Sequence, residues 1–303
     1  MCIRDRTYSK QFTRPINEIA NQYAQIQSAL AGAERVFDVM DSEPEDQGGN
    51  EPFEIENVKG DLNFKDIDFS YVKGEQVLKH FDLWVKSGQK IAIVGATGSG
   101  KTTVVNLLTR FYDIDGGVIT LDGQDIRNIP VNKLRGSIGI VLQDTVIFSD
   151  TIAQNIRYGR IDATDEEIVE AAKIARVDDF ASKLSDGYNT MLTEGGSNLS
   201  QGQRQLISIA RAVLADPKIL ILDEATSSID TRTEMHIQEA MVALMKGRTS
   251  LIIAHRLSTI RDADKIVVIS GGKVVEAGDH DELLAQKGEY YKLYQSQFAG
   301  IAT

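Results

Sequence analysis

Residues 91–104 read IAIVGATGSGKTTV. The first four, Ile91–Val94, are all apolar, which suits a strand buried on both faces of a parallel sheet. The next eight, Gly95–Thr102, match the pattern G-x-x-x-x-G-K-[ST] in full. A helix-forming run, Thr103–Tyr112, follows. This order of strand, glycine-rich turn and helix predicts an α/β fold with a polyphosphate-binding loop.

The residue types of the loop indicate its chemistry. Glycines let successive backbone N–H groups point into one concavity, and the N-terminus of the next helix adds positive potential. We expect Lys101 to reach the β- and γ-phosphates and to act in catalysis, and Thr102 to ligate Mg²⁺. The residues expected around the nucleotide are Gly95, Ala96, Thr97, Gly98, Ser99, Gly100, Lys101, Thr102 and Thr103.

Four more apolar runs predict strands of the same, largely parallel sheet. They are Ile138–Leu142, Ile219–Leu222, Leu251–Ala254 and Ile266–Ile269. Between Ser149 and Ser200 the pattern becomes helical, and a capping box at Thr164 opens a helix that we expect to run through Arg176. We therefore predict a helical subdomain, at about residues 150–203, inserted into the α/β core.

Two carboxylates follow the predicted strand Ile219–Leu222. An enzyme that hydrolyses a nucleotide at a phosphate-binding loop needs one acid for the metal and one for the attacking water. We expect Asp223 to hold Mg²⁺ through coordinated water, and Glu224 to act as the general base or to orient the water.

The N-terminal part has a different pattern. Apolar residues at alternating steps of three and four predict one long amphipathic helix from Ile16 to Met40. The helix packs either on its own domain or on a partner that this chain lacks. An acidic stretch with Pro and Gly, Asp41–Glu56, is typical of a solvated linker. The seam residues are Ile16, Ile19, Tyr23, Ile26, Leu30, Ala33, Phe37 and Met40.

The composition excludes several classes of protein. A net charge of −11 argues against a broad basic surface for nucleic acid. Cys2 is the single cysteine, so an internal disulfide and a cysteine metal cluster are excluded, and a reducing setting fits. The apolar runs are far shorter than the roughly 20 residues of a membrane-spanning helix. Residues 1–6 have no apolar segment of a secretory signal.

The pentapeptide Leu199–Gln203 precedes a helix-forming run, Arg204–Leu214, and its Ser200 and Gln203 fit a capping box. It resembles the signature motif of ABC transporters. Together with the upstream loop and the downstream acidic pair, it makes the chain similar to an ABC nucleotide-binding domain. Gln201 stands where the family most often has glycine, a departure frequent among exporters.

The resemblance implies further site residues. Tyr71 would stack on adenine. Gln143 would touch Mg²⁺ and the nucleotide and sense a membrane partner. His255 would contact the γ-phosphate as a catalytic residue, and residues 227–230 resemble the loop that crosses between two such domains. The signature residues that would close on the nucleotide are Ser200, Gly202 and Gln203.

Other segments resemble exporters in particular. Thr193–Gly196 is similar to a loop found in exporters, where Glu194 would contact the membrane domain. Gln11–Ile16 and Ala33–Asp38 resemble the stretch that leads from the last transmembrane helix into the ATPase domain. The resemblance implies a remnant of that helix at 1–40, an acidic linker at 41–60, an ABC ATPase domain at 61–298 with an antiparallel β subdomain at its N-terminal side, and a tail at 299–303.

The resemblance implies an ATPase that powers export across a membrane. It would lie at the cytoplasmic face of the inner membrane, paired head to tail with a second ABC domain, as a homodimer or a heterodimer, and with a transmembrane domain. Two alternatives stay open: a soluble ABC ATPase acting on the ribosome or nucleic acid, and a pairing subunit of a heterodimeric transporter. The first would carry a tandem cassette or long coiled-coil insertions, which this length does not accommodate.

Overall fold

The computed structural model describes residues 2–49, 52–142, 145–223, 230–254 and 257–297. The chain divides into two compact units, and the boundary along the sequence lies between Asp46 and Gln47.

The first unit consists of one helix, α1 (Cys2–Met40), of 39 residues. It begins earlier than the sequence predicts, and Pro15 lies inside it. Its described side chains are all exposed, and the large apolar residues of the predicted seam are each at least 53% exposed. Within the described residues, we find no helix that is long and apolar enough to cross a membrane.

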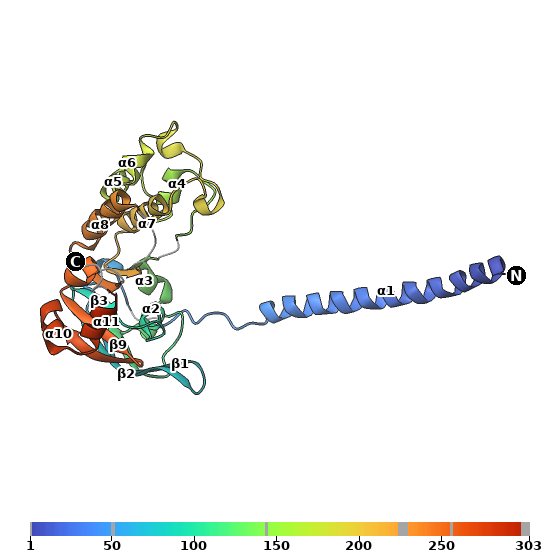
Figure 1. The fold of residues 1–303 in the computed structure, drawn as a ribbon, viewed down its shortest axis with the longest axis horizontal. Coiled ribbons are helices and arrows are strands. Elements are labelled where there is room, and N and C mark those ends of the chain that lie inside the picture. The colour runs from blue at the N-terminus through green and yellow to red at the C-terminus, as the bar shows by residue number, and fades with distance from the viewer. Residues whose placement is uncertain (1, 50–51, 143–144, 224–229, 255–256, 298–303) are drawn as a thin grey trace. The chain divides into compact units, whose positions relative to one another are not determined.

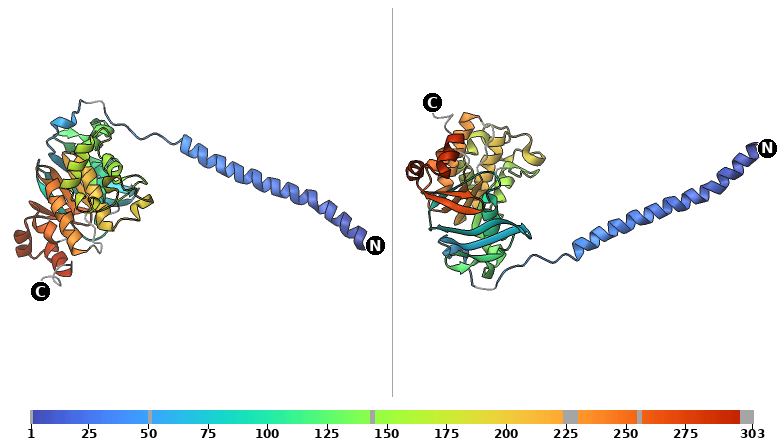
Figure 2. Two further views of the ribbon diagram at one scale, coloured as in Figure 1. Left: turned by 90° about the horizontal axis from the view of Figure 1, so that it is seen from above. Right: turned by 60° about the horizontal axis from the view of Figure 1, so that its bottom comes forward.

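The second unit contains two sheets (Figures 1 and 2). The four-stranded sheet is antiparallel, in the order β2-β1-β4-β5. Its strands are β1 (Leu62–Val72), β2 (Glu75–Val85), β4 (Gly116–Leu121) and β5 (Gln124–Asp125). It corresponds to the antiparallel β subdomain that the resemblance implied.

The six-stranded sheet has the order β10-β9-β3-β8-β7-β6 and is parallel except for the edge strand β10. All five predicted strands are present in it. Its strands are β3 (Lys90–Val94), β6 (Ile138–Val141), β7 (Ile219–Asp223), β8 (Thr249–Ile253), β9 (Lys265–Ser270) and β10 (Lys273–Gly278).

Apolar residues on both faces of the parallel sheet explain its continuous apolar runs. Leu220 and Leu222 face a core that includes residues of the helices, whereas Ile219 and Ile221 face a core shared with the antiparallel sheet. All four are fully buried. Because side chains alternate along a strand, each run supplies both cores.

The region between Ser149 and Ser200 contains helices, as its sequence pattern predicts. The capping box at Thr164 is formed, but α5 ends at Ile174 because Arg176 adopts a left-handed conformation at φ 60°. The helices of this region are α4 (Ile152–Arg157), α5 (Asp165–Ile174), α6 (Asp178–Ala181) and α7 (Gln201–Ala215), and those that follow are α8 (Thr231–Met245), α9 (Leu257–Arg261), α10 (His280–Gln286) and α11 (Glu289–Gln297).

Two segments differ from their sequence-based expectation. Helix α2 (Lys101–Leu108) stops short of Tyr112, because Arg110 has φ 52° and turns the chain. Within the expected linker, the Gln47 carbonyl accepts from the Val131 N–H at 2.9 Å, and Phe53 is only 7% exposed. The remaining short elements are the helix α3 (Val131–Gly136) and the 3₁₀ turns Ile55–Asn57, Ile126–Asn128, Gly187–Asn189 and Glu194–Gly196.

Candidate nucleotide-binding site

The glycine-rich loop joins the end of β3 to the first residue of α2. A Cβ at Gly95 would lie 2.3 Å from the Ile269 carbonyl oxygen, so only glycine fits there. Gly100 caps α2 in a left-handed conformation at φ 109°, which side chains disfavour. The backbone therefore forms the tight loop that the sequence predicts, directly at a helix N-terminus, where N–H groups attract anions.

Lys101 lies inside this loop. Its Nζ donates to the carbonyl oxygens of Gly95 at 2.8 Å and Ala96 at 2.9 Å. Burial lowers the pKa of Lys101, and the negative charge of Asp223 raises it by less. The lysine is thus held by two neutral acceptors, and a phosphate group could replace them with a stronger, charge-assisted partner.

The hydroxyl groups of the loop have different surroundings. Thr102 is exposed at the start of α2. Ser99 is buried, and its hydroxyl has no hydrogen-bond partner within the part of the chain that the structure describes. A buried polar group without a hydrogen-bond partner is rare in native proteins. It therefore fits a site whose hydrogen bonds are completed by a ligand.

Tyr71, the residue expected to stack on adenine, contacts helix α2. Its hydroxyl donates to Thr103 Oγ1 at 3.2 Å and accepts from Asn106 Nδ2 at 3.1 Å. The rings of Phe69 and Tyr112 meet the Tyr71 ring edge to face, at centroid distances of 4.8 and 4.9 Å. Tyr71 as a whole residue is 44% exposed, so part of it is accessible to a ligand.

Sequence reasoning missed Asn106 and Tyr112 as neighbours of Tyr71. Asn106 lies on α2, and Tyr112 follows the turn at Arg110. Packing of β1 and α2 into one hydrophobic core brings Tyr71 to these residues, and no local pattern in the sequence predicts that contact.

Asp223 ends β7, on the parallel sheet that also carries β3. It is partly exposed, and it acts electrostatically on Lys101. A hydroxyl from Thr102 and a carboxylate from Asp223 are hard oxygen donors of the kind that Mg²⁺ prefers, since this ion keeps several waters and binds few protein groups. The donor set therefore fits Mg²⁺.

The signature residues occupy the N-terminus of α7. The Ser200 hydroxyl accepts from the Gln203 N–H at 3.2 Å, and the Ser200 N–H donates to Gln203 Oε1 at 2.9 Å. Gly202 is buried in the first turn. The predicted capping box is thus present, and it leaves the positive end of a 15-residue helix beside Ser200.

Three expected site residues lie outside the described residues: Gln143, Glu224 and His255. The same holds for residues 227–229 of the segment that resembles the crossing loop. Its last residue, Asp230, caps α8 by accepting from the Thr233 N–H at 2.9 Å. Glu194 is exposed in its 3₁₀ turn.

Comparison with known proteins bears directly on this site. A family model described as ABC transporter matches residues 78–227, which include the loop, the signature and the end of β7. This chain belongs to the ABC transporter family. The match confirms the resemblance to an ABC nucleotide-binding domain, and the similarity to a solved ABC exporter structure confirms the exporter type and the P-loop ATPase fold.

Several bacterial proteins are similar to this ABC domain over most of its length. The chain is 56% identical over 291 residues to an uncharacterized ABC transporter ATP-binding protein of Bacillus subtilis, covering 96% of this chain and 48% of that protein. It is 53% identical over 286 residues to a fatty acid ABC transporter ATP-binding/permease protein of Mycobacterium tuberculosis, covering 94% of this chain and 45% of that protein.

A third relative of the ABC domain is an ATP-dependent lipid A-core flippase of Syntrophus aciditrophicus, 49% identical, with 94% of this chain and 47% of that protein covered. Among solved structures, a bacterial Atm1-family ABC exporter with ATP bound is similar at a TM-score of 0.82 and 40% identity, covering 97% of this chain and 51% of that chain. The chain therefore spans about half the length of these relatives. Because the named relatives are transporters and a flippase, the alternative of a soluble ABC ATPase is not favoured.

Proposed function

We propose that this ABC domain hydrolyses ATP to drive export by a longer protein that includes a membrane domain. The observation that carries the proposal is the loop from Gly95 to Thr102, with Lys101 buried inside it and Tyr71 beside it. The loop supplies the phosphate site, and Tyr71 supplies an aromatic face for adenine at one end of α2.

The loop residues bind the phosphate chain, mostly through the backbone. Lys101 exchanges the carbonyls of Gly95 and Ala96 for the β- and γ-phosphates. The backbone from Gly95 to Thr103 surrounds the phosphates, and the hydroxyl of Ser99, which is buried without a partner in the described part of the chain, donates to one of them. This exchange replaces neutral acceptors with charged ones, so it favours the bound state.

Thr102 and Asp223 would hold Mg²⁺, with Gln143 as a further oxygen ligand. The ion, when bound, neutralises charge that develops on the phosphate oxygens. Glu224, next to Asp223 in sequence, accepts a proton from the attacking water, and His255 donates to the γ-phosphate. We assign these roles on sequence position, because Gln143, Glu224 and His255 lie outside the described residues.

We propose that two such domains pair head to tail. The Ser200 hydroxyl, Gly202 and Gln203 would then meet the γ-phosphate held by the other domain's loop, since the N-terminus of α7 is a second helix end that favours an anion. In the whole protein, opening and closing of the pair would act on a transmembrane domain through Glu194, at the cytoplasmic face of the membrane.

The test is Mg²⁺-dependent phosphate release by the wild-type chain and by Glu224→Gln. We expect the variant to bind ATP but to hydrolyse it at least about 100-fold more slowly, the usual contribution of a general base. Glu170→Gln, an exposed carboxylate on α5, is the matched control and should keep the wild-type rate. Equal rates for Glu224→Gln and wild type would contradict the assigned role.

A further inference from the structure

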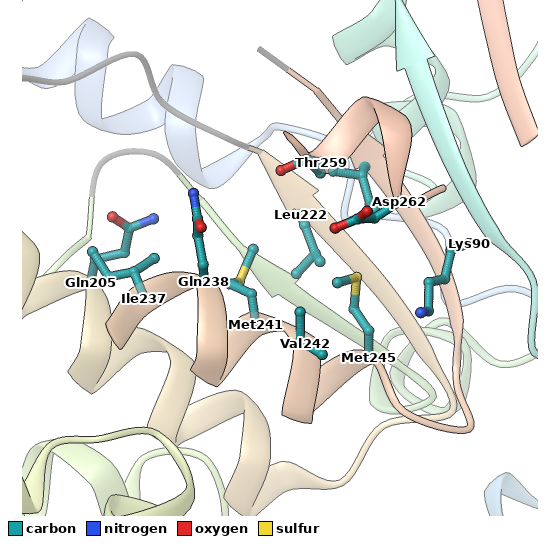
Figure 3. A pocket seen from close by; sticks show the side chains of 11 residues that line it. Lys90, Gln205, Leu222, Ile237, Gln238, Met241, Val242, Met245, Thr259 and Asp262 are labelled. Atoms are coloured by element: carbon teal, nitrogen blue, oxygen red, sulfur yellow. The ribbon is translucent and has the colours of Figure 1, made fainter. Parts of the chain in front are cut away.

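A cavity of about 240 Å³ lies between the parallel sheet and helix α8. Figure 3 shows its lining, with Leu222 of β7 on one side and a row of α8 side chains on the other. Of the described residues that line it, none belongs to the glycine-rich loop. The α8 residues are Ile237, Gln238, Met241, Val242 and Met245.

Six of the described residues that line the cavity are apolar. Leu222, Ile237 and Ile252 are at most 3% exposed, and two methionine side chains complete the wall with flexible, polarizable groups. A cavity of about 150 Å³ lined by such residues stays dry and binds benzene. In proportion, the 240 Å³ found here holds an apolar body of about ten carbon atoms.

One buried polar group faces this space. Gln205 of α7 is 6% exposed and lines the cavity at one end of the row in Figure 3. Its amide atoms are not among the fully buried, unpaired side-chain atoms of the described residues, so they border the open space of the cavity. An amide that borders a cavity can donate hydrogen bonds to a molecule there and accept them from it. A ligand that carries a hydrogen-bonding group would satisfy Gln205.

The opposite end of the cavity carries two opposite charges, Lys90 and Asp262 (Figure 3). Asp262 is exposed, and so is Val242 of α8, so the cavity opens to solvent near both residues. Lys90 would attract a bound anion and Asp262 would repel it. For a bound cation the two effects are exchanged. The lining therefore favours a molecule without net charge.

We propose that this cavity is a binding site for a small uncharged molecule with an apolar body of about ten carbons and one hydrogen-bonding group, which pairs with Gln205. The occupant would touch Leu222, the neighbour of Asp223, and Gln205, on the helix that Ser200 caps. The site is separate from the nucleotide loop.

The probe is 2-naphthol, added to the chain with ¹³C-labelled methionine methyl groups and followed by NMR. The chain has six methionines, of which Met241 and Met245 line the cavity, while Met40 and Met191 are exposed elsewhere. We expect saturable shifts of the Met241 and Met245 signals and none for Met40 and Met191. Equal or absent shifts at all four would overturn the proposal.

Matched variants locate the bound molecule. Met241→Trp fills the cavity and should abolish binding, whereas Met235→Trp, on an exposed position of α8, should not. Gln205→Leu should lower the affinity for 2-naphthol by about 2- to 12-fold, which corresponds to the loss of one hydrogen bond. The affinity for naphthalene, which has no hydroxyl, should not change.

The remaining comparisons decide the chemical class, even if Met241→Trp does not fold. Naphthalene-2-sulfonate has the same ring system and a negative charge, so it should bind at least about tenfold more weakly than 2-naphthol, because its charge would leave water for a largely apolar cavity in which Lys90 and Asp262 offset each other. The proposed class is wrong if the sulfonate binds as tightly, or if Gln205→Leu affects naphthalene and 2-naphthol equally.

Discussion

Lys101 Nζ lies 2.8 Å from the carbonyl oxygen of Gly95, the first residue of the loop that Lys101 closes. The lysine is 9% exposed, so the loop folds around its own cation. This arrangement keeps a positive charge inside a ring of backbone groups, where it attracts a phosphate chain.

The first prediction concerns this lysine. Lys101→Ala removes a charge-assisted contact to phosphate, which typically contributes about 1.5–3 kcal/mol. We therefore expect ATP affinity to fall by about 10- to 150-fold, measured by calorimetry. Lys183→Ala, at an exposed position of the helical subdomain, is the control. Unchanged affinity of Lys101→Ala would show that ATP binds elsewhere.

The second prediction separates the ring of Tyr71 from its hydroxyl. Tyr71→Leu removes the stacking face, which is worth about 1–3 kcal/mol per base, so ATP affinity should fall about 5- to 150-fold. Tyr71→Phe keeps the ring and loses only the bonds to Thr103 and Asn106, so its loss should stay below about tenfold. Equal losses in a nucleotide titration would mean that the ring does not stack on the base.

The third prediction compares two capping boxes. Ser200→Ala and Thr164→Ala each remove an N-cap, and each should lower stability by about 1 kcal/mol in a thermal melt. Only Ser200→Ala should reduce ATP hydrolysis at saturating ATP, by roughly tenfold or more, because only Ser200 is expected at a phosphate. A matching loss of activity in Thr164→Ala would assign the effect to stability alone.

The fourth prediction concerns pH. His80 Nδ1 lies 2.7 Å from Asp66 Oδ1, and this hydrogen bond, with the charges of Asp68 and Asp66, raises the pKa of His80, while burial and Lys273 lower it less. The stabilising contribution is therefore complete below the unfolded pKa of about 6.5 and is lost as pH rises through the folded value.

An NMR titration of the histidine rings checks this fourth prediction. His80 should titrate above its ordinary range and His280 below it, because burial lowers the pKa of His280. Asp66→Asn should move the pKa of His80 down and leave that of His280 in place. A His80 pKa that does not respond to Asp66→Asn would contradict the assigned cause.

The parallel sheet could be predicted from the sequence because each strand is an apolar run that enters two cores. Ile91 and Ala92, adjacent in β3, are both fully buried but belong to different cores. The strands β1 and β2 could not be delimited this way, since register shifts at Phe64, Ile67 and Phe69 break the alternation that marks a half-buried strand.

The candidate site also has parts that the sequence predicts and parts that it does not. Its loop and the Ser200 capping box are local, so spacing alone predicts them. The approach of Tyr71 to Asn106 joins residues 35 positions apart. The described lining of the cavity at Gln205 comes from the helices α7, α8 and α9, the strands β3, β7 and β8, and Asp262. Such contacts depend on tertiary packing, which no periodicity in the sequence reports.

The most direct test of the central claim is the rate of Mg²⁺-dependent ATP hydrolysis per molecule as the concentration of the chain is raised, with sedimentation to follow its association. We expect the rate per molecule to climb as dimers form, and Glu224→Gln to stay silent at every concentration. Constant activity per molecule in a chain that sediments as a monomer would contradict a site shared between two ABC domains.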